Sequence, residues 1–185
     1  NLGVDGVMLI SAFASFYVVL NTGSVWLGLL AAILVGLLMG LLMSFISITL
    51  KAEQGISGIG LYMFGLGLSS LLFKTMIGTV KTVTGFQPVK VPLLGDIPVI
   101  GEIFFHHSLL VYGAFLLVPL AWWVMEKTTW GLRIKSVGQN PAAADSLGVN
   151  VDRVRYFSVC LGSILAGIAG ASLSISLLNL FQENL

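Results

Sequence analysis

The longest interval without a charged residue is the feature that most limits how this chain can fold. Residues 6–50 include no Asp, Glu, Lys or Arg. About 20 helical residues cross a hydrocarbon core roughly 30 Å thick, so this interval is too long for one transmembrane helix. A turn signal at residues 21–24, with Trp26 beside it as an interfacial anchor, divides the interval. We therefore expect spans at residues 4–20 and 25–50, the first being either a short complete helix or a broken one.

Three further apolar runs follow, at residues 56–73, 108–124 and 156–181, with polar segments between them. Hydrophobic residues make up 57% of the 185-residue chain and charged residues only 9%, whereas a soluble domain averages about 25% charged residues. The runs are continuously apolar and do not alternate, which argues against a β-barrel. The sequence predicts an all-α fold, a polytopic transmembrane helical bundle of about five spans in a single domain over residues 1–185.

The polar segments predict the loops and the orientation. The proline-rich segment 74–107 is expected to be an extended loop. Six basic residues lie in segment 126–155 and the break after residue 50, against three in segment 74–107. These are Lys51, Lys127, Arg133, Lys135, Arg153 and Arg155, against Lys74, Lys81 and Lys90. By the positive-inside rule we expect segment 126–155 to be cytoplasmic and segment 74–107 to face outward.

The two ends of the chain carry no processing signal. The chain begins at Asn1 without an initiator Met and ends at Leu185 directly after an apolar run. No basic leader or small-residue cleavage site is present, so we do not expect a signal peptide. We expect instead a fragment, cut at both ends, of a longer protein.

Small residues recur at helical spacing in two of the predicted spans. Gly36 and Gly40 form a GxxxG pair, and the residues Gly162, Ala166 and Gly170 recur every four positions on one helix face. Lipid tails are as apolar as leucine, so helices in a bilayer associate where small residues let their backbones approach. We expect these five residues to lie in helix–helix contacts, which are either static or able to slide between transport states.

Several function classes lack their usual residues. No charged residue lies deep within a predicted span, which weakens an ion-coupled carrier or a voltage sensor. The sequence has no phosphate-binding P-loop, no Gly-x-Ser-x-Gly motif and no zinc-type Cys/His spacing, so we expect neither enzymatic activity nor a bound metal. A net charge of +1 provides no strong field for nucleic acid.

One short segment outside the predicted spans has the pattern of a helix with both ends marked. Asn140 suits the N-cap, Pro141 the first helical position and Gly148 the stop. The residues of this candidate site are Gly138, Asn140, Pro141, Ala142, Ala143, Ala144, Asp145 and Gly148, with Arg133 and Lys135 as nearby basic residues. A helix over residues 141–147 has about two turns and is not stable alone in water. We therefore expect it to dock either on its own bundle or on a soluble partner.

The region around this helix resembles the coupling loop of ABC-importer permeases of the branched-chain amino acid and simple-sugar superfamily. The matching residues are Thr129, Gly131, Arg133, Gly138, Asn140, Pro141, Ala143, Ala144 and Gly148. Residues 1–6 resemble the family's opening, with Asp5 in place of the usual Glu. Segments 94–101 and 155–173 resemble the branch of simple sugars and nucleosides, and segments 53–58 and 181–184 also match, so the resemblance covers essentially the whole chain.

The resemblance implies a permease subunit of an ATP-driven importer in the cell (inner) membrane. Nucleosides or simple sugars are the expected solutes, and branched-chain amino acids come second. The implied partners are ABC ATPase subunits, a second permease subunit, an extracytoplasmic solute-binding protein and membrane lipid, with no nucleic acid. ATP would be hydrolysed by the partner subunits, so this chain is expected to bind no cofactor.

The resemblance also assigns roles within the chain. Residues 140–148 would form the coupling helix that sits in a groove of the ATPase, and Arg133 and Lys135 would either support that docking surface or face solvent and lipid headgroups. Asn1 and Asp5 are either pathway residues or ordinary helix-start residues, and the solute-binding residues stay unassigned. Two other classes remain open, namely an ion-gradient-driven secondary carrier and a non-transporting membrane scaffold.

Overall fold

A computed structural model describes residues 2–79, 81–90 and 106–181. Five of its helices are long and apolar enough to cross a membrane, so the predicted all-α bundle of five spans is confirmed. The helices are α1 (Val4–Thr22), α2 (Val25–Ser44), α3 (Gln54–Met76), α5 (Leu109–Lys127) and α8 (Val151–Ser172). Two of them continue as π-helices, α2 into η1 (Phe45–Thr49) and α8 into η2 (Leu173–Leu177).

The first span is one complete helix. Helix α1 runs unbroken for 19 residues, so the broken alternative is wrong. Gly23 ends it with φ of 70°, a left-handed conformation that glycine adopts without steric cost. The turn between α1 and α2 therefore lies where residues 21–24 predict it.

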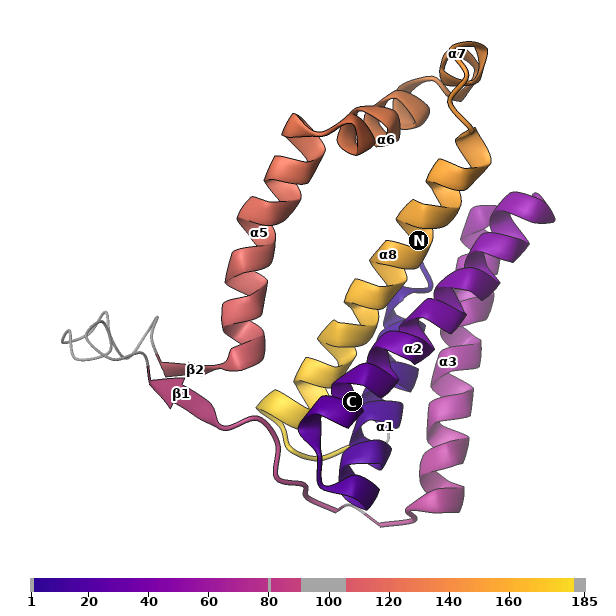
Figure 1. The fold of residues 1–185 in the computed structure, drawn as a ribbon. Coiled ribbons are helices and arrows are strands. Elements are labelled where there is room, and N and C mark those ends of the chain that lie inside the picture. Colours follow the sequence, from indigo (N-terminus) through magenta and orange to yellow (C-terminus); the bar gives the residue numbers. More distant parts are fainter. Residues whose placement is uncertain (1, 80, 91–105, 182–185) are drawn as a thin grey trace.

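Helices α1, α2 and α8 pack against one another along their lengths, and α3 packs against α1 (Figure 1). The core lies on α1, where Val7 and Phe16 have no exposed surface. An aromatic cluster of Phe13, Phe16, Phe73 and Phe181 closes the end of the bundle at which α1 and α3 finish.

Small residues form the closest helix contacts. A Cβ added at Gly36 would lie 2.7 Å from the Ser163 carbonyl oxygen, and one at Gly40 would lie 2.8 Å from the Ser163 Cβ. A Cβ at Gly170 would overlap the Met8 carbonyl of α1. Three of the five predicted packing glycines and alanines therefore separate helix backbones that have no room for a larger side chain, and a fourth, Ala166, is 6% exposed.

The prediction that Gly162 lies in a helix–helix contact is wrong. It is exposed, and a Cβ added there would meet no atom within 4 Å. Gly167 lies in the helix contact instead, since its added Cβ would come within 2.6 Å of the Ala32 carbonyl oxygen. The reason is the 3.6-residue turn of the helix, because a stripe with a spacing of four drifts around the surface over two turns.

Helix α5 stands apart from the other spans, and none of its residues is buried (Figure 1). Its first turn touches the bundle through Leu110, which packs on an apolar cluster around Val19, and the preceding Ser108 accepts a hydrogen bond from the Ser176 hydroxyl at 2.7 Å. Its other end continues into α6 (Thr129–Gln139) and α7 (Pro141–Ser146).

The described part of segment 74–107 is extended beyond α3. Strand β1 (Pro88–Lys90) pairs antiparallel with β2 (His106–Ser108), which leads into α5. The predicted motif at 94–101 lies outside the described residues, as do Asn1 and residues 182–184. The loop holding Lys51 lies at the same end of the molecule as α6 and α7, whereas the hairpin lies at the other end (Figure 1).

Candidate functional site

Helix α7 carries the local features that the sequence predicts for it. The Asn140 side chain caps the helix by accepting a hydrogen bond from the Ala143 N–H at 3.1 Å. Pro141 occupies the first helical position. Gly148 follows the helix with φ of 81°, which favours glycine over any other residue. The helix ends one residue before the predicted end.

One face of α7 packs on its own chain. Ala144 is 3% exposed and lies in a small apolar cluster with Val137 of α6 and Val154 of α8. The other residues of α7 are exposed. Of the two docking surfaces that the sequence allows, the bundle therefore takes one face of the helix, and the opposite face is free to meet a second surface.

Leu147 is a residue that the sequence analysis does not select. It is the C-cap of α7, and at 83% it is the most exposed large apolar side chain among the described residues. It lies outside the spans, next to an exposed helix of alanine and polar residues. A single large apolar residue at the end of such a helix is the signal that could have found it, because a buried contact with a partner would remove it from water.

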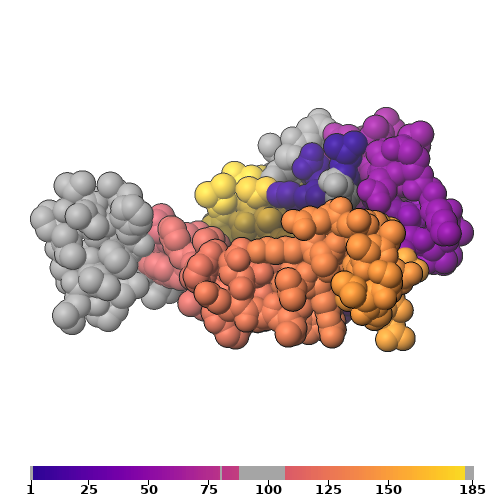
Figure 2. Space-filling model, turned by 90° about the horizontal axis from the view of Figure 1, so that it is seen from above, coloured from indigo at the N-terminus to yellow at the C-terminus, as the bar shows by residue number. Residues whose placement is uncertain are grey.

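Helix α6 is also absent from the sequence analysis, which predicts only one helix between α5 and α8. Its 11 residues gather apolar side chains on one face, where Gly131 and Val137 are buried and Ile134 is half-buried, and this helical spacing is the signal that could have found it. Seen from the α7 end, α6 and α7 form one continuous surface across the molecule (Figure 2). The two helices contact each other, and α6 also contacts α8.

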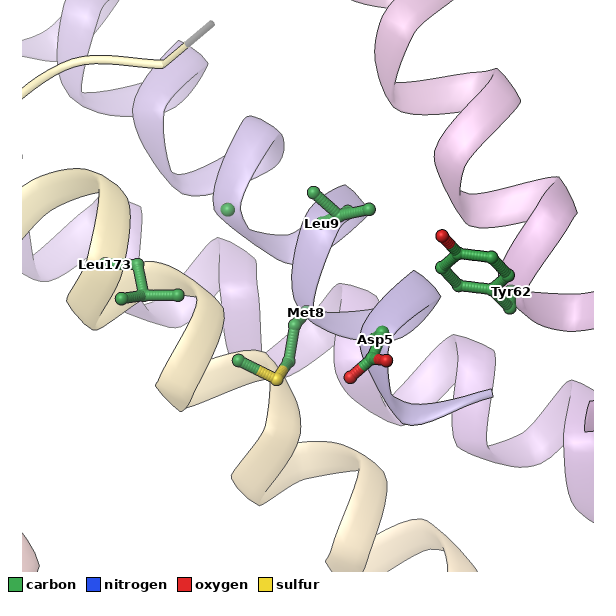
Figure 3. Close-up of a pocket in the computed structure, with 6 residues that line it drawn as sticks. Asp5, Met8, Leu9, Tyr62 and Leu173 are labelled. Carbon is green, nitrogen blue, oxygen red and sulfur yellow. The ribbon is translucent and has the colours of Figure 1, made fainter. Parts of the chain in front are cut away.

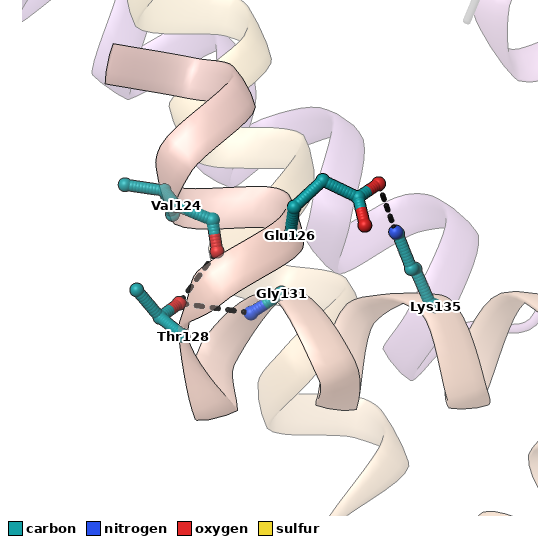
Figure 4. A network of polar contacts seen from close by, with 5 residues as sticks. All are labelled: Val124, Glu126, Thr128, Gly131 and Lys135. Atoms are coloured by element: carbon teal, nitrogen blue, oxygen red, sulfur yellow. Dashed lines mark hydrogen bonds and ion pairs between the residues drawn. The ribbon is translucent and has the colours of Figure 1, made fainter. Parts of the chain in front are cut away.

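Polar contacts hold the turn from α5 into α6 (Figure 4). The Thr128 hydroxyl donates a hydrogen bond to the Val124 carbonyl at 2.6 Å and accepts one from the Gly131 N–H at 3.3 Å. Lys135 of α6 forms an ion pair with Glu126 of α5. A Cβ at Gly131 would overlap the Val124 carbonyl, so the two helices meet without a side chain between them. The direction of α6 is therefore fixed relative to α5.

Helices α5, α6 and α7 form an arm beside the bundle. The two basic residues of the predicted docking surface have partners within this arm. Lys135 bonds to Glu126, and the Arg133 guanidinium lies 5.7 Å from the centre of the Trp130 ring. That ring lies 5.1 Å from the ring of Phe157 in α8. Arg133 and Lys135 thus help to position α6, and a direct contact with a partner protein stays a prediction.

A groove of about 440 Å³ lies between α6, the start of α7, the start of α8 and the end of the α2–η1 helix. Its lining includes Met43 and Ser47 of the α2–η1 helix, Val137 of α6, Pro141 of α7 and Arg155 of α8. The groove places the start of α7 opposite the end of α2. A displacement of α7 would therefore change the packing at the end of two transmembrane helices.

A second cavity, of about 270 Å³, lies between α1, α3 and the start of η2 (Figure 3). One face of α1 supplies most of its wall, with Tyr62 and Leu173 on either side. The lining residues are Asp5, Met8, Leu9, Ala12, Tyr62 and Leu173. The sequence analysis leaves solute-contacting residues unassigned, and it weighs only Asp5 of these six.

Asp5, in the first turn of α1, lies beside the interior of α3 and not beside its start. A Cβ at the neighbouring Gly6 would lie 2.7 Å from the Tyr62 Cα. Tyr62 is eight residues after Gln54, the first residue of α3, which is about 12 Å along a helix that rises 1.5 Å per residue. Helix α1 thus starts about a third of the way along α3, and Asp5 lies in the first turn of α1, the helix-start position that the sequence analysis allows for it.

Metal binding finds no support in the part of the chain that the structure describes, where no three His, Cys, Asp or Glu residues are grouped. The backbone N–H of His107 donates a hydrogen bond to the Tyr112 hydroxyl at 3.2 Å. The exposed face of α7 and the cavity beside Asp5, both described above, are the two candidate sites.

Comparison with known proteins identifies transport relatives. Residues 1–182 match the family model described as the branched-chain amino acid transport system / permease component. The guanosine ABC transporter permease protein of Bacillus subtilis is 39% identical over 92% of this chain, and the nucleoside ABC transporter permease protein of Lactococcus lactis subsp. cremoris is 38% identical over 92%. A putative glucose ABC transporter permease protein of Haloferax volcanii is 37% identical over 95%.

The chain spans about half the length of these relatives, namely 56%, 57% and 54% of each. No solved structure matches it. The family match covers nearly every residue, and the helices it covers are the five spans described above. This chain is a multi-span membrane protein that belongs to the family of the branched-chain amino acid transport system / permease component.

Proposed function

We propose that this chain is part of the permease subunit of an ATP-binding-cassette importer in the cell (inner) membrane, and that the importer carries a nucleoside or a simple sugar. The family match supports the permease role. Two relatives are named for guanosine or nucleosides and one for glucose, each at 37–39% identity, which supports this class of solute over branched-chain amino acids.

The observation that carries the coupling role is the free face of α7. Ala144 anchors the helix to α6 and α8, while the residues around it and Leu147 are exposed. A helix this short gains its stability from docking. We infer that the anchored face transmits movement to the bundle and that the free face sits on an ATPase subunit.

The groove below α7 supports a mechanism for that transmission. ATP-driven movement of the ATPase subunits would displace α7, and α6 would carry the displacement to α5 through the Thr128 and Lys135 contacts. The start of α8, which contacts α6, would move with it. This reading places the α7 end in the cytoplasm, as the excess of basic residues predicts.

Energy in this proposal comes from partner subunits. The complete complex would contain ABC ATPase subunits that hydrolyse ATP, a second permease subunit and an extracytoplasmic solute-binding protein. The depth of Asp5 supports one rival, an ion-coupled carrier, because carriers of that class use carboxylates within the membrane. A scaffold that only recruits a soluble protein is the other rival.

Solute uptake into proteoliposomes tests the proposal. The vesicles would contain the full-length parent protein with its ATPase, second permease subunit and binding protein, and uptake of labelled guanosine, glucose and leucine would be measured. We expect ATP-dependent uptake of guanosine or glucose. Ala143→Pro should reduce that uptake at least about tenfold, because proline removes the Ala143 N–H that Asn140 caps and disfavours the helical conformation of Ala142 before it.

Thr129→Pro is the matched control. Thr129 is exposed and occupies the first helical position of α6, where proline is tolerated. We expect it to keep uptake near the wild-type rate. Wild-type uptake that ignores ATP and follows an ion gradient would contradict the importer, and transport of leucine alone would contradict the proposed solute. Equal uptake by Ala143→Pro and wild type would contradict the coupling role of α7.

A further inference from the structure

We propose that the cavity between α1, α3 and η2 binds the transported solute through its hydroxyl groups, with the Asp5 carboxylate as acceptor and the Tyr62 ring as a wall. The inference rests on the proposed function, and it names the solute class as neutral and polyhydroxylated. A ribose of a nucleoside and a simple sugar share this chemistry. The cavity, the depth of Asp5 and the composition of the lining support it.

Close backbone packing holds the cavity walls in place. A Cβ at Gly6 would lie 2.7 Å from the Leu61 carbonyl oxygen, and one at Gly65 would overlap the Gly6 carbonyl. On the other side, a Cβ at Gly170 would overlap the Met8 carbonyl. The first turns of α1 are thus clamped between α3 and α8, so Asp5 and Tyr62 are presented from a rigid frame, as a binding site requires.

The position of Asp5 requires a polar environment. Its side chain is exposed at the cavity, about a third of the way along α3 from its start. A carboxylate facing hydrocarbon at that depth is costly, and such groups usually face a water-filled path or a partner. The cavity is the described space next to Asp5, so we infer that it is hydrated and lies on the solute pathway.

The lining residues select by charge. Asp5 is the one charged group among the described lining residues, and an ionised carboxylate only accepts hydrogen bonds. Two adjacent hydroxyls of a sugar can donate to its two oxygens. A phosphate or carboxylate on the solute would meet this charge without a basic partner, so neutral solutes are favoured over nucleotides and amino acids.

The apolar part of the lining suits the rest of such a solute. Tyr62 is half-buried and presents its ring from α3, opposite Leu173 in Figure 3. Met8 and Leu9 lie between them. Binding sites for small molecules combine mostly apolar walls with a few placed polar groups, which is the arrangement here. Leu173 also begins a π-helix, a rare element that is frequent at functional sites.

Uptake kinetics of an Asp5→Asn variant test the inference in the full-length complex described above. We expect the KM for guanosine or glucose to rise about 10–100-fold, because a charge-assisted hydrogen bond is lost, and ATP-dependent uptake to return at high solute concentration. Asp5→Glu keeps the carboxylate and should stay within about tenfold of wild type. Asp152→Asn makes the same change in the first turn of α8, away from the cavity, and should leave KM unchanged.

The outcomes separate the two proposals. Wild-type vesicles that show no ATP-dependent uptake of either solute would contradict the proposed function itself. Wild-type uptake together with an unchanged KM in Asp5→Asn would overturn the cavity assignment and leave the importer standing. Uptake of guanosine alone or of glucose alone would decide between the two sources of hydroxyl groups.

A labelling experiment covers the case in which Asp5→Asn reduces the amount of folded protein. Leu9→Cys would be placed in a full-length permease in which Cys160 and every other cysteine are replaced by Ser. Modification of the introduced thiol by a water-soluble methanethiosulfonate reagent would be timed in the assembled complex. Slower modification in the presence of guanosine or glucose is expected, and a rate that neither solute changes would overturn the assignment.

Discussion

The bundle of α1, α2, α3 and α8 and the arm of α5, α6 and α7 are stabilised in opposite ways. In the bundle, backbones approach at glycines and serines, and side chains such as Phe16 and Ile175 have no exposed surface. In the arm, α5 has no buried residue, and the turns depend on caps at Thr128 and Asn140 and on one ion pair. Close packing is a large and cooperative source of stability, whereas a cap contributes about 0.5–2 kcal/mol and a surface ion pair about 1 kcal/mol or less.

The difference indicates that the bundle and the arm have different mechanical roles. A packed bundle resists deformation and can hold a cavity such as the one beside Asp5. An arm with local contacts and a free helix can be displaced by a partner without unfolding the bundle. Changes in the bundle should therefore lower stability first, and changes in the arm should lower coupling first.

The largest expected effect comes from enlarging a glycine in the bundle. Gly170→Val places a branched side chain against the Met8 carbonyl of α1, and the helices must separate to admit it. Overpacking of this kind costs about 1–3 kcal/mol and sometimes more. We expect a clear fall in the thermal unfolding temperature of the purified protein in detergent.

Gly162→Val is the matched control, since it makes the same substitution in the same helix. A Cβ added at that position meets no atom within 4 Å. Its unfolding temperature should stay close to that of the wild type. Equal destabilisation by the two substitutions would show that the contact between α1 and α8 does not hold the bundle together.

A smaller effect, limited to coupling, is expected in the arm. Leu147→Ala removes an 83%-exposed side chain, so the unfolding temperature should not change. If Leu147 enters a groove of the ATPase, the truncation should weaken binding between permease and ATPase by about 1–2 kcal/mol, roughly tenfold. Titration of the ATPase onto permease in nanodiscs measures this affinity.

Leu132→Ala is the control for Leu147→Ala. Leu132 is 67% exposed on α6 and has the same side chain. We expect it to leave the ATPase affinity unchanged. Loss of affinity in Leu132→Ala but not in Leu147→Ala would move the contact from α7 to α6.

The smallest effect concerns a polar cap within the bundle itself. The Glu53 carboxylate accepts hydrogen bonds from the Ile56 and Gly55 N–H groups at the start of α3, and these bonds lower the pKa of Glu53 from its ordinary value of 4.5. A lowered pKa contributes stability that is present above the unfolded value and is lost as the pH falls through the folded value. Glu53→Gln should therefore lower the unfolding temperature slightly at pH 7.

The pH dependence supplies the check on Glu53. The difference in unfolding temperature between wild type and Glu53→Gln should shrink as the pH is lowered below 4.5. A difference that stays constant down to pH 3 would contradict the role of the charged cap. A difference as large as that of Gly170→Val would contradict the view that packing, and not polar capping, holds the bundle.

The sequence predicts the spans and the short helix because their signals are local. Apolar runs and a turn signal mark α1 and α2, and Asn140, Pro141 and Gly148 mark α7 by backbone chemistry alone. Helix α6 is missed because its signals are a short amphipathic pattern and the Thr128 cap, which a search for continuous apolar runs does not detect. Its position depends on contacts with α5 and α8.

The cavity beside Asp5 could not be predicted from the sequence. Its lining comes from α1, α3 and η2, which are far apart in the chain. The depth of Asp5 depends on how far α1 slides along α3, and that offset is set by the contact between Gly6 and Gly65. The predicted contact at Gly162 is wrong for a related reason, since a fixed spacing of four does not follow the turn of the helix across a whole span.

Cross-linking at Leu147 tests the central claim, that the arm meets the ATPase while the bundle holds the pathway. Leu147→Cys would be introduced into the full-length permease with Cys160→Ser, and single cysteines would be scanned over the surface of the ATPase in transport-competent vesicles. We predict disulfide formation with one patch of the ATPase, with a yield that changes when ATP is added. Absence of any cross-link from Leu147→Cys, together with cross-links from Gly162→Cys in the bundle, would contradict the account.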